Sequence, residues 1–231
     1  MKPRCSENRI QAITLMEAAV TICVIGLVIL VLLPGLRASK IKHHPISCSN
    51  NLKQIGLAFK IWEGDHNDKF PMGLSVTNGG TYELMETPEA WRAFQVMSNE
   101  LSTPMILRCP QDSTRTNFTK GFCDDLKNNI SYFTGIVADD SDPQSIVSGD
   151  DNFRLNNSPV SIGDYTISSN SEVEWDASRH FWKVKQGWFE EVKINYGYLM
   201  MADGSVQSAS DAGLKIYIQP SNVVTNRLAI P

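Results

Sequence analysis

Five aspartates in the middle of the chain are its most chemically suggestive residues. Carboxylate oxygens are ligands that Ca²⁺ prefers, and this ion takes about six to eight oxygens from flexible loops. The spacing of the five does not match an EF-hand loop, and an acidic loop exposed to water would have the same composition. A calcium site and a solvated loop are therefore the two interpretations of Asp139, Asp140, Asp142, Asp150 and Asp151.

The cysteines indicate disulfide chemistry rather than metal binding. Three of the five, Cys48, Cys109 and Cys123, follow the apolar N-terminal segment, and their spacing matches no zinc site. An odd number leaves room for one disulfide in an oxidising compartment. The alternative is that all three stay reduced and pack as small apolar side chains.

No arrangement typical of a catalytic centre occurs in the sequence. The motifs G-x-S-x-G, H-E-x-x-H and C-x-x-C, the P-loop and the dinucleotide-binding glycine pattern are all missing. The formal net charge of −4, without a Lys/Arg cluster beside an aromatic stripe, is unlike that of a nucleic-acid-binding protein. We expect neither an enzyme nor a nucleic-acid-binding protein, and no cofactor other than the candidate calcium.

The most distinctive element of the sequence is an apolar segment near its N-terminus. Residues 13–36 are almost continuously apolar and long enough to cross a bilayer as a helix, which takes about 20 residues. A short basic stretch, residues 1–12, precedes them, as in a targeting signal. A cleaved signal peptide and a plain membrane anchor are two interpretations. The second leaves Glu17 as an ionisable group in a lipid-facing helix, where charge is costly.

The residues around Glu17 support a third interpretation. Residues 12–17, A-I-T-L-M-E, followed by the apolar run, resemble the class III signal of type IV prepilins and type II secretion pseudopilins, whose typical sequence is G-F-T-L-I-E. The resemblance implies that a prepilin peptidase cleaves after Ala12 and methylates the new N-terminus at Ile13. It also implies that the apolar helix serves as both membrane anchor and assembly helix.

In such an assembly, Glu17 would have a structural role. A carboxylate buried among apolar helices needs an opposite charge nearby, and the α-amino group of a neighbouring subunit supplies one. Glu17 would thus set the register between subunits.

Segments further along the chain resemble a large group of bacterial pseudopilin-like proteins. Residues 48–58 match the group's C-x-N-N-L-K-Q-I-G-L-A, residues 109–112 its C-P-x-D, residues 131–132 its S-Y tract and residues 202–206 its A-D-G-x-V. These segments touch most of the chain, and no catalytic activity is attached to them. The occurrence of both cysteines in the group favours a Cys48–Cys109 disulfide, with Cys109–Cys123 as the alternative.

Apolar periodicity predicts how the stem is built. Leu52, Ile55, Phe59 and Trp62 recur at helical spacing and form one stripe of an amphipathic helix within residues 37–66. We expect this stripe to pack across an antiparallel sheet, as the resemblance implies. Pro45 predicts a break or bend near residues 42–47.

Segments typical of strands occur late in the chain. Residues 130–137, 172–175, 181–184 and 194–201 are rich in aromatic and β-branched residues. A short helical stretch is expected around residues 89–99. Asp203-Gly204 predicts a hairpin with a type I′ turn, because glycine accepts a positive φ. A tight turn explains Asp203 better than an active-site role does.

These patterns predict an α+β, pilin-like fold in which a long N-terminal helix, half membrane-spanning and half amphipathic, packs on an antiparallel β-sheet. The expected divisions are a leader (1–12), a transmembrane and assembly helix (13–36), a stem helix (37–66) and a periplasmic head domain (67–231). The expected function is that of a structural subunit of a type II secretion or type IV pilus-like filament. The expected location is the bacterial inner membrane, crossed once, or a surface filament. The expected partners are other pilin-like subunits, the prepilin peptidase and the inner membrane.

The alternative function is a membrane-tethered periplasmic domain that binds a sugar or a peptide. Trp175, Trp182 and Trp188 would form its aromatic platform. The same tryptophans also suit the core of a small α+β domain.

Overall fold

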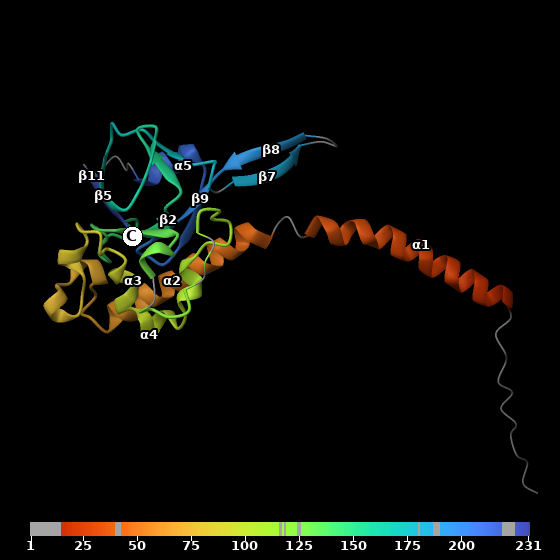
Figure 1. Ribbon diagram of the computed structural model, residues 1–231, viewed down its shortest axis with the longest axis horizontal. Helices are drawn as coiled ribbons and strands as arrows, with labels where there is room; N and C mark the ends of the chain where they lie inside the picture. Colours follow the sequence, from red (N-terminus) through yellow and green to blue (C-terminus); the bar gives the residue numbers. More distant parts are fainter. Residues whose placement is uncertain are drawn as a thin grey trace, which may run out of the picture. The chain divides into compact units, whose positions relative to one another are not determined.

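The computed structural model describes residues 15–39, 43–115, 117, 119–123, 126–179, 181–186, 190–218 and 225–231 (Figure 1). The chain divides into two compact units, Met1–His43 and His44–Pro231. The boundary lies inside the predicted stem segment, residues 37–66, so residues 44–66 of that segment belong to the same unit as the predicted head domain.

Helix α1 (Leu15–Ser39) belongs to the first unit. Its sequence is dominated by leucine, isoleucine, valine and alanine, and no proline interrupts its first five turns. Glu17 lies in its first turn, where a negative charge is favoured by the partial positive charge of the helix N-terminus.

The prediction of a membrane-spanning helix, and with it a single-pass location in the bacterial inner membrane, is wrong for the part of the chain that the structure describes. No helix there is both long enough and apolar enough to cross a bilayer. The side chains described on α1 are those of residues 15–29.

Helix α2 (His43–Gly64) is the amphipathic helix predicted for the stem. The break or bend was predicted near residues 42–47; α1 ends at Ser39 and α2 begins at His43, and α2 itself runs without interruption through residues 43–47. Pro45 lies in its first turn, where the N–H that proline lacks would have no partner within the helix. The apolar stripe is confirmed as buried, with exposures of 0–3%, for Leu52, Ile55, Phe59 and Trp62.

Short helices follow α2. Helices α3 (Arg92–Val96) and α4 (Ser98–Leu101) lie in and next to the segment predicted to be helical. A later helix, α5 (Asp211–Ile218), lies near the end of the chain, between the last two strands. The 3₁₀ segments are η2 (Pro71–Gly73), η3 (Val76–Asn78), η4 (Tyr82–Leu84), η5 (Pro104–Leu107) and η6 (Leu126–Asn128).

A six-stranded antiparallel sheet forms the centre of the second unit, in the order β10-β9-β2-β1-β11-β5. The predicted class, α+β with an antiparallel sheet, is confirmed. Strands β1 and β9 fall within segments predicted to be strands. The six are β1 (Tyr132–Gly135), β2 (Ile146–Asp150), β5 (Gly163–Ser168), β9 (Gly197–Met201), β10 (Val206–Ala209) and β11 (Thr225–Ile230).

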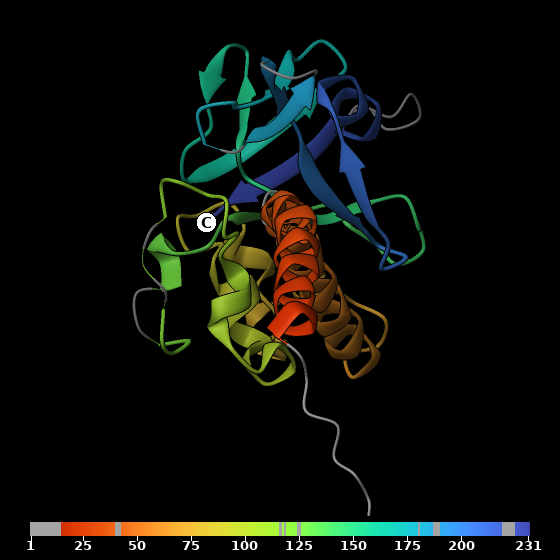
Figure 2. The same ribbon diagram turned by 90° about the vertical axis from the view of Figure 1, so that its right-hand side faces the viewer.

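The two faces of this sheet contact different apolar clusters, because successive residues of a strand point to opposite sides. Tyr132 and Met200 pack with the α2 stripe, whereas Phe133 and Leu199 pack with residues of α5. Figures 1 and 2 show α2 to α4 on one side of the sheet and α5 on the other. Gly56 permits the close approach of α2 to β9, since a Cβ there would lie 2.6 Å from Met200 Sδ.

Two smaller antiparallel sheets complete the described strands. One has the order β4-β3-β6, and the other is a two-stranded hairpin of β7 and β8. Strand β6 falls in a predicted segment, and β7 begins with the predicted segment 181–184 and extends beyond it to Gln186. The bounds are β3 (Phe153–Leu155), β4 (Ser158–Pro159), β6 (Val173–Trp175), β7 (Phe181–Gln186) and β8 (Glu190–Asn195).

The turn at Asp203-Gly204 joins β9 to β10, as predicted, but its type differs. Gly204 has a φ of 82°, whereas Asp203 is not among the residues with positive φ. A type I′ turn needs positive φ at both central positions. The Gly204 N–H instead donates to Met201 O (2.9 Å), and the Met201 N–H donates to Ser205 O (2.9 Å). This is the three-residue hairpin loop with glycine in the left-handed position.

Candidate functional site

The described side chains of α1 form an almost entirely apolar surface that is exposed. A helix that is apolar on all sides is normally buried in a larger assembly or core. Exposures of its large apolar residues run from 49% to 89%. These residues are Leu15, Met16, Val20, Ile22, Val24, Ile25, Leu27, Val28 and Ile29.

Glu17 is the acidic residue within this surface, and its side chain is exposed. One turn later, the Thr21 hydroxyl lies within hydrogen-bonding distance of two backbone oxygens, 3.0 Å from Glu17 O and 2.9 Å from Ala18 O. The Thr21 hydroxyl is thereby satisfied within the helix and needs no partner outside it. The other predicted processing residues, Ala12 and Ile13, lie outside the described residues.

In the second unit, the loop of residues 108–115, here called the Cys109 loop, is tied to the stem. A disulfide joins Cys48 of α2 to Cys109, with their Cα atoms 5.1 Å apart. This is the pairing that the resemblance implied. The side chain of Asn51, one turn along α2, donates from Nδ2 to Arg108 O (3.1 Å). Cys123 is exposed and unpaired in the described part of the chain.

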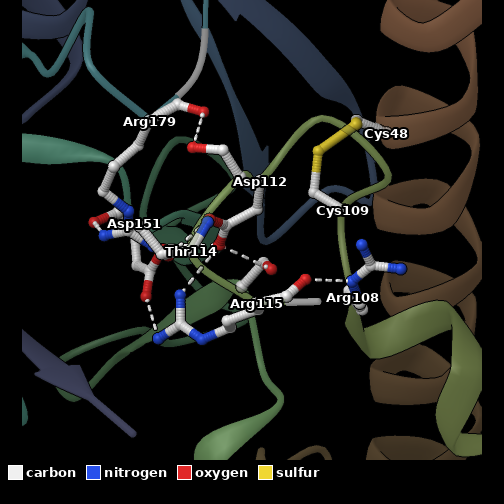
Figure 3. Close-up of polar contacts among 10 residues, drawn as sticks. Cys48, Arg108, Cys109, Asp112, Thr114, Arg115, Asp151 and Arg179 are labelled. Atoms are coloured by element: carbon white, nitrogen blue, oxygen red, sulfur yellow. Dashed lines mark hydrogen bonds and ion pairs between the residues drawn. A yellow bond between two sulfur atoms is a disulfide. The ribbon is translucent and has the colours of Figure 1, made fainter. Parts of the chain in front are cut away.

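Asp112 is the buried acceptor at the centre of the Cys109 loop (Figure 3). Its Oδ2 accepts from Arg115 Nη1, Arg179 Nη2 and Ser131 Oγ, each at 2.9 Å. Its Oδ1 accepts from Thr114 N (3.0 Å) and Thr114 Oγ1 (2.6 Å). Burial alone would raise the pKa of Asp112, but Arg179, Thr114 and Arg115 outweigh it and hold this pKa well below its usual range.

Asp151 completes a square of charges with Asp112 and the two arginines. Its Oδ2 lies 2.6 Å from Arg115 Nη2, and its Oδ1 lies 2.7 Å from Arg179 Nη2. Arg179 also donates from Nη1 to the backbone oxygen of Asp151 (3.1 Å). Burial would lower the pKa of Arg179, but Asp151 and Asp112 raise it, so the arginine stays charged.

The Cys109 loop also holds both ends of the β7–β8 hairpin. Arg179, just before β7, binds Asp112, and Tyr196, just after β8, donates its hydroxyl to Gln111 Oε1 (2.8 Å). The Ser113 N–H adds a long contact to Arg179 O (3.5 Å). Two adjacent residues of one loop, Gln111 and Asp112, therefore hold both ends of the hairpin, and the disulfide connects the same loop to α2.

A pocket of about 390 Å³ opens beside this charge cluster. Arg115, Arg179 and Asp151 line it together with the hydroxyl-bearing Thr114 and Ser161. Each guanidinium already lies within 2.9 Å of two carboxylates, so the positive charge at the pocket is balanced. We therefore interpret the cluster as a structural clamp.

The structure does not bring the five candidate calcium ligands together. Asp139 Oδ1 accepts from the Ser141 N–H (2.9 Å), Asp142 Oδ1 accepts from the Gln144 N–H (3.1 Å), and Asp140 pairs with Lys60. The other two lie at the far end of strand β2, with Asp150 as its last residue and Asp151 directly after it. Among the described residues no group of three or more His, Cys, Asp or Glu is arranged to hold a metal ion.

Asp150 lies at the end of β2 and is fully buried. Its Oδ2 accepts from the Tyr198 N–H (2.8 Å). Burial, together with the negative charges of Asp151 and Asp112, raises its pKa well above the usual range. In the unfolded chain the Asp150 carboxyl group loses its proton near a pKa of about 3.9, whereas in the folded chain it keeps the proton to higher pH. The contribution of Asp150 to folding stability therefore falls as the pH rises above about 4.

The Asp150→Asn variant removes this titration. We expect the free energy of unfolding of the variant, minus that of wild type, to increase as the pH rises from about 4 to about 7. Urea unfolding at the two pH values measures the change. Asp142→Asn, at an exposed position, is the matched control, and the same relative stability of the Asp150 variant at both pH values would contradict the assignment.

The tryptophan platform is not supported at Trp175. This side chain is 1% exposed and donates from Nε1 to Ala209 O (2.8 Å), so it belongs to the core. A Cβ at Gly197 would lie 2.4 Å from its ring, which shows how closely β9 packs on it. Trp188 and the side chain of Trp182 lie outside the described part of the structure.

The resemblance implied the Cys48–Cys109 disulfide, and its C-P-x-D segment contains Asp112, but the sequence predicted no role for Asp112 and none of its partners. Arg179 lies 67 residues from Asp112 and Tyr196 lies 85 residues from Gln111. No short motif marks such pairs. The aromatic pair Tyr196 and Tyr198 was visible in the sequence only as part of a strand.

Comparison of the chain with protein-family models, with curated proteins and with solved structures gave no match.

Proposed function

We propose that this protein is a structural subunit of a pilin-like filament of the type II secretion or type IV pilus kind. One observation carries the proposal: α1 is an exposed apolar helix with a carboxylate, Glu17, in its first turn. The segment resembles the prepilin signal, so the subunit would enter the filament after a prepilin peptidase cleaves at Ala12 and methylates Ile13.

Copies of the same helix are the natural cover for this surface. Burial of a large aliphatic side chain contributes about 1.5–3 kcal/mol, and α1 exposes nine of them. A bundle of α1 helices from several subunits would remove this surface from water. Glu17 would then be desolvated, which is tolerable only beside a positive charge such as the amino terminus of a neighbouring chain.

The second unit suits a subunit whose outer part must stay fixed to its stem. The disulfide and the Asp112 cluster connect α2, the Cys109 loop and the hairpin without any obvious catalytic group. A rigid head on an assembly helix is the arrangement that a filament requires of its subunits.

Glu17→Gln tests the proposal directly. We expect the variant to lose at least about tenfold in assembly, a change of about 1.4 kcal/mol, because the neutral amide cannot pair with an amino terminus. The measurement is coexpression with a prepilin peptidase, followed by bifunctional-maleimide cross-linking between chains at Cys23, which is exposed on α1. The Cys123→Ser background removes the other exposed thiol of the described residues.

Glu86→Gln, at an exposed position of the head, is the matched control and should cross-link like the parent chain. Mass spectrometry of the same samples should find N-methylated Ile13 only when the peptidase is present. An unprocessed chain, or equal cross-linking of the two glutamine variants, would refute the filament role.

A further inference from the structure

The last two turns of α2 carry a lysine that contacts two carboxyl groups at once. Lys60 Nζ lies 3.1 Å from Glu63 Oε2, one turn along the same helix. It also donates a hydrogen bond to Asp140 Oδ1, which lies 80 residues away in the loop between β1 and β2. An amine, an aspartate carboxyl group and a second carboxyl group therefore meet at one place in the second unit.

Glu63 distinguishes this arrangement from an ordinary surface ion pair. Its side chain is 5% exposed, whereas the side chains of Lys60 and Asp140 are 32% and 39% exposed. Burial raises the pKa of Glu63, Lys60 opposes this effect and Asp140 adds to it, so the pKa lies above its usual value. Hydrogen bonds from Lys60 and from Glu63 lower the pKa of Asp140. Glu63 therefore keeps its proton to higher pH than Asp140 and can pass that proton to it.

The reacting groups are held in place from both sides. Asp139 Oδ1 accepts from the Ser141 N–H (2.9 Å), and this bond fixes the backbone on either side of Asp140. The ring of Phe70 lies beside the amine, with its centroid 5.5 Å from Lys60 Nζ. Well-oriented groups in one molecule react as though present at effective concentrations that reach about 10⁵–10⁸ M.

We infer that Lys60 and Asp140 condense to an intramolecular amide, an isopeptide bond, with Glu63 transferring the protons. Lys60 first gives a proton to Asp140, and the neutral Nζ attacks Asp140 Cγ to form the new C–N bond. Glu63 gives a proton to the departing oxygen, the C–O bond breaks and one water leaves. Glu63 then takes a proton from Nζ and regains its starting state, and no electron is exchanged.

The electrostatics of the amine determine how fast this step can be. Burial lowers the pKa of Lys60, but Asp140 and Glu63 outweigh it and raise the pKa above its usual value. The amine therefore loses its proton to a bonded carboxylate and not to bulk water, and its neutral form is short-lived. We accordingly expect the bond to form slowly after folding.

The bond would give α2 a second covalent connection. The disulfide joins Cys48, in the first half of α2, to the Cys109 loop, and the amide would join the last two turns of α2 to the loop before β2. This inference is independent of the proposed function, because the same bond would form in a chain that never assembles.

Intact-mass spectrometry of the full chain, with its disulfide reduced, tests the inference. We expect the mass to fall by one water as the folded chain ages. Trypsin should then leave residues 54–69 joined to residues 128–154, because cleavage after an amide-linked Lys60 is blocked. A chain that keeps its full mass refutes the bond. A water loss confined to residues 128–154, as a cyclic imide at Asp140 would give, also refutes it.

Matched variants separate the reacting groups from the proton-transfer group. Lys60→Arg keeps the positive charge but has no amine to form the bond, so it should keep its full mass. Glu63→Gln keeps both reacting groups and should react at least about a hundredfold more slowly, since a positioned acid–base group contributes about 10²–10⁴-fold. Glu86→Gln, at an exposed position, should react like wild type. Water loss in Lys60→Arg would overturn the inference, and equal rates in the two glutamine variants would overturn the role of Glu63.

Discussion

Replacing Asp112 with asparagine should lower the melting temperature of the full chain by roughly 10 °C. Asp112 accepts from both arginines of the clamp, and its loss leaves Arg115 and Arg179 facing one carboxylate instead of two. Breaking one member of a buried charge network costs about 3–5 kcal/mol. In a chain of this size each kcal/mol corresponds to about 2–4 °C, and differential scanning calorimetry measures the shift.

The pH dependence of this loss has a defined sign. The pKa of Asp112 in the folded chain lies below its unfolded value, so its contribution is complete above about pH 4 and disappears as the pH falls further. The difference between wild type and Asp112→Asn should therefore shrink in acid. Asp65→Asn, at an exposed position just after α2, is the matched control and should melt within about 1–2 °C of wild type.

A local measurement distinguishes the clamp from a general loss of stability. Hydrogen exchange in Asp112→Asn should accelerate in residues 181–195 before it accelerates in β9. Tyr196→Phe, which removes the hydrogen bond to Gln111, should accelerate hydrogen exchange in the same residues with a smaller loss of stability. Equal acceleration throughout the central sheet would show that the cluster does not act on the hairpin.

Removing the Cys48–Cys109 disulfide should destabilise the chain by about 4 kcal/mol. The bond closes a loop with a sequence separation of 61 residues, and restricting a loop of that length in the unfolded chain accounts for this value. Urea unfolding of Cys48→Ser with Cys109→Ser should show a lower midpoint, whereas Cys123→Ser should leave the midpoint unchanged because that thiol is exposed.

Chemical reduction supplies an independent comparison. Dithiothreitol should lower the midpoint of the parent chain to that of the double serine variant and leave the variant unaffected. A parent chain with the same midpoint in both redox states would mean that the bond is not formed in solution, and the connection between α2 and the Cys109 loop would then be non-covalent, with the Asn51 hydrogen bond as one part of it.

Local sequence patterns predicted those elements in which apolar or strand-forming residues recur at regular spacing. The stripe from Leu52 to Trp62 is confirmed because helical spacing and a single buried face leave little freedom. Strands β1, β6, β7 and β9 were predicted from aromatic and β-branched residues. Strand β2, I-V-S-G-D, escaped because serine, glycine and aspartate are poor strand formers, and burial on both faces overrides that preference here.

The errors arose where distant residues decide the outcome. Asp150 and Asp151 follow an acidic stretch and were grouped with it, yet β2 carries them to a buried position beside Arg179, which the sequence places far away. The type of the Asp203-Gly204 turn depended on the φ of Asp203, which residue type alone does not determine. The membrane-spanning prediction rested on the length of an apolar run, and the described residues contain no helix that meets the requirement.

The arrangement of the Cys109 loop has a mechanical consequence. A pull on the β7–β8 hairpin acts on Arg179 and Tyr196, which transmit it to neighbouring residues of one loop, and from there it reaches α2 across a covalent bond. This load path runs in parallel with the backbone connection from β8 into β9. Tension between the outer part of the molecule and its stem is thus shared by two routes, so the six-stranded sheet need not unzip when the hairpin is stretched.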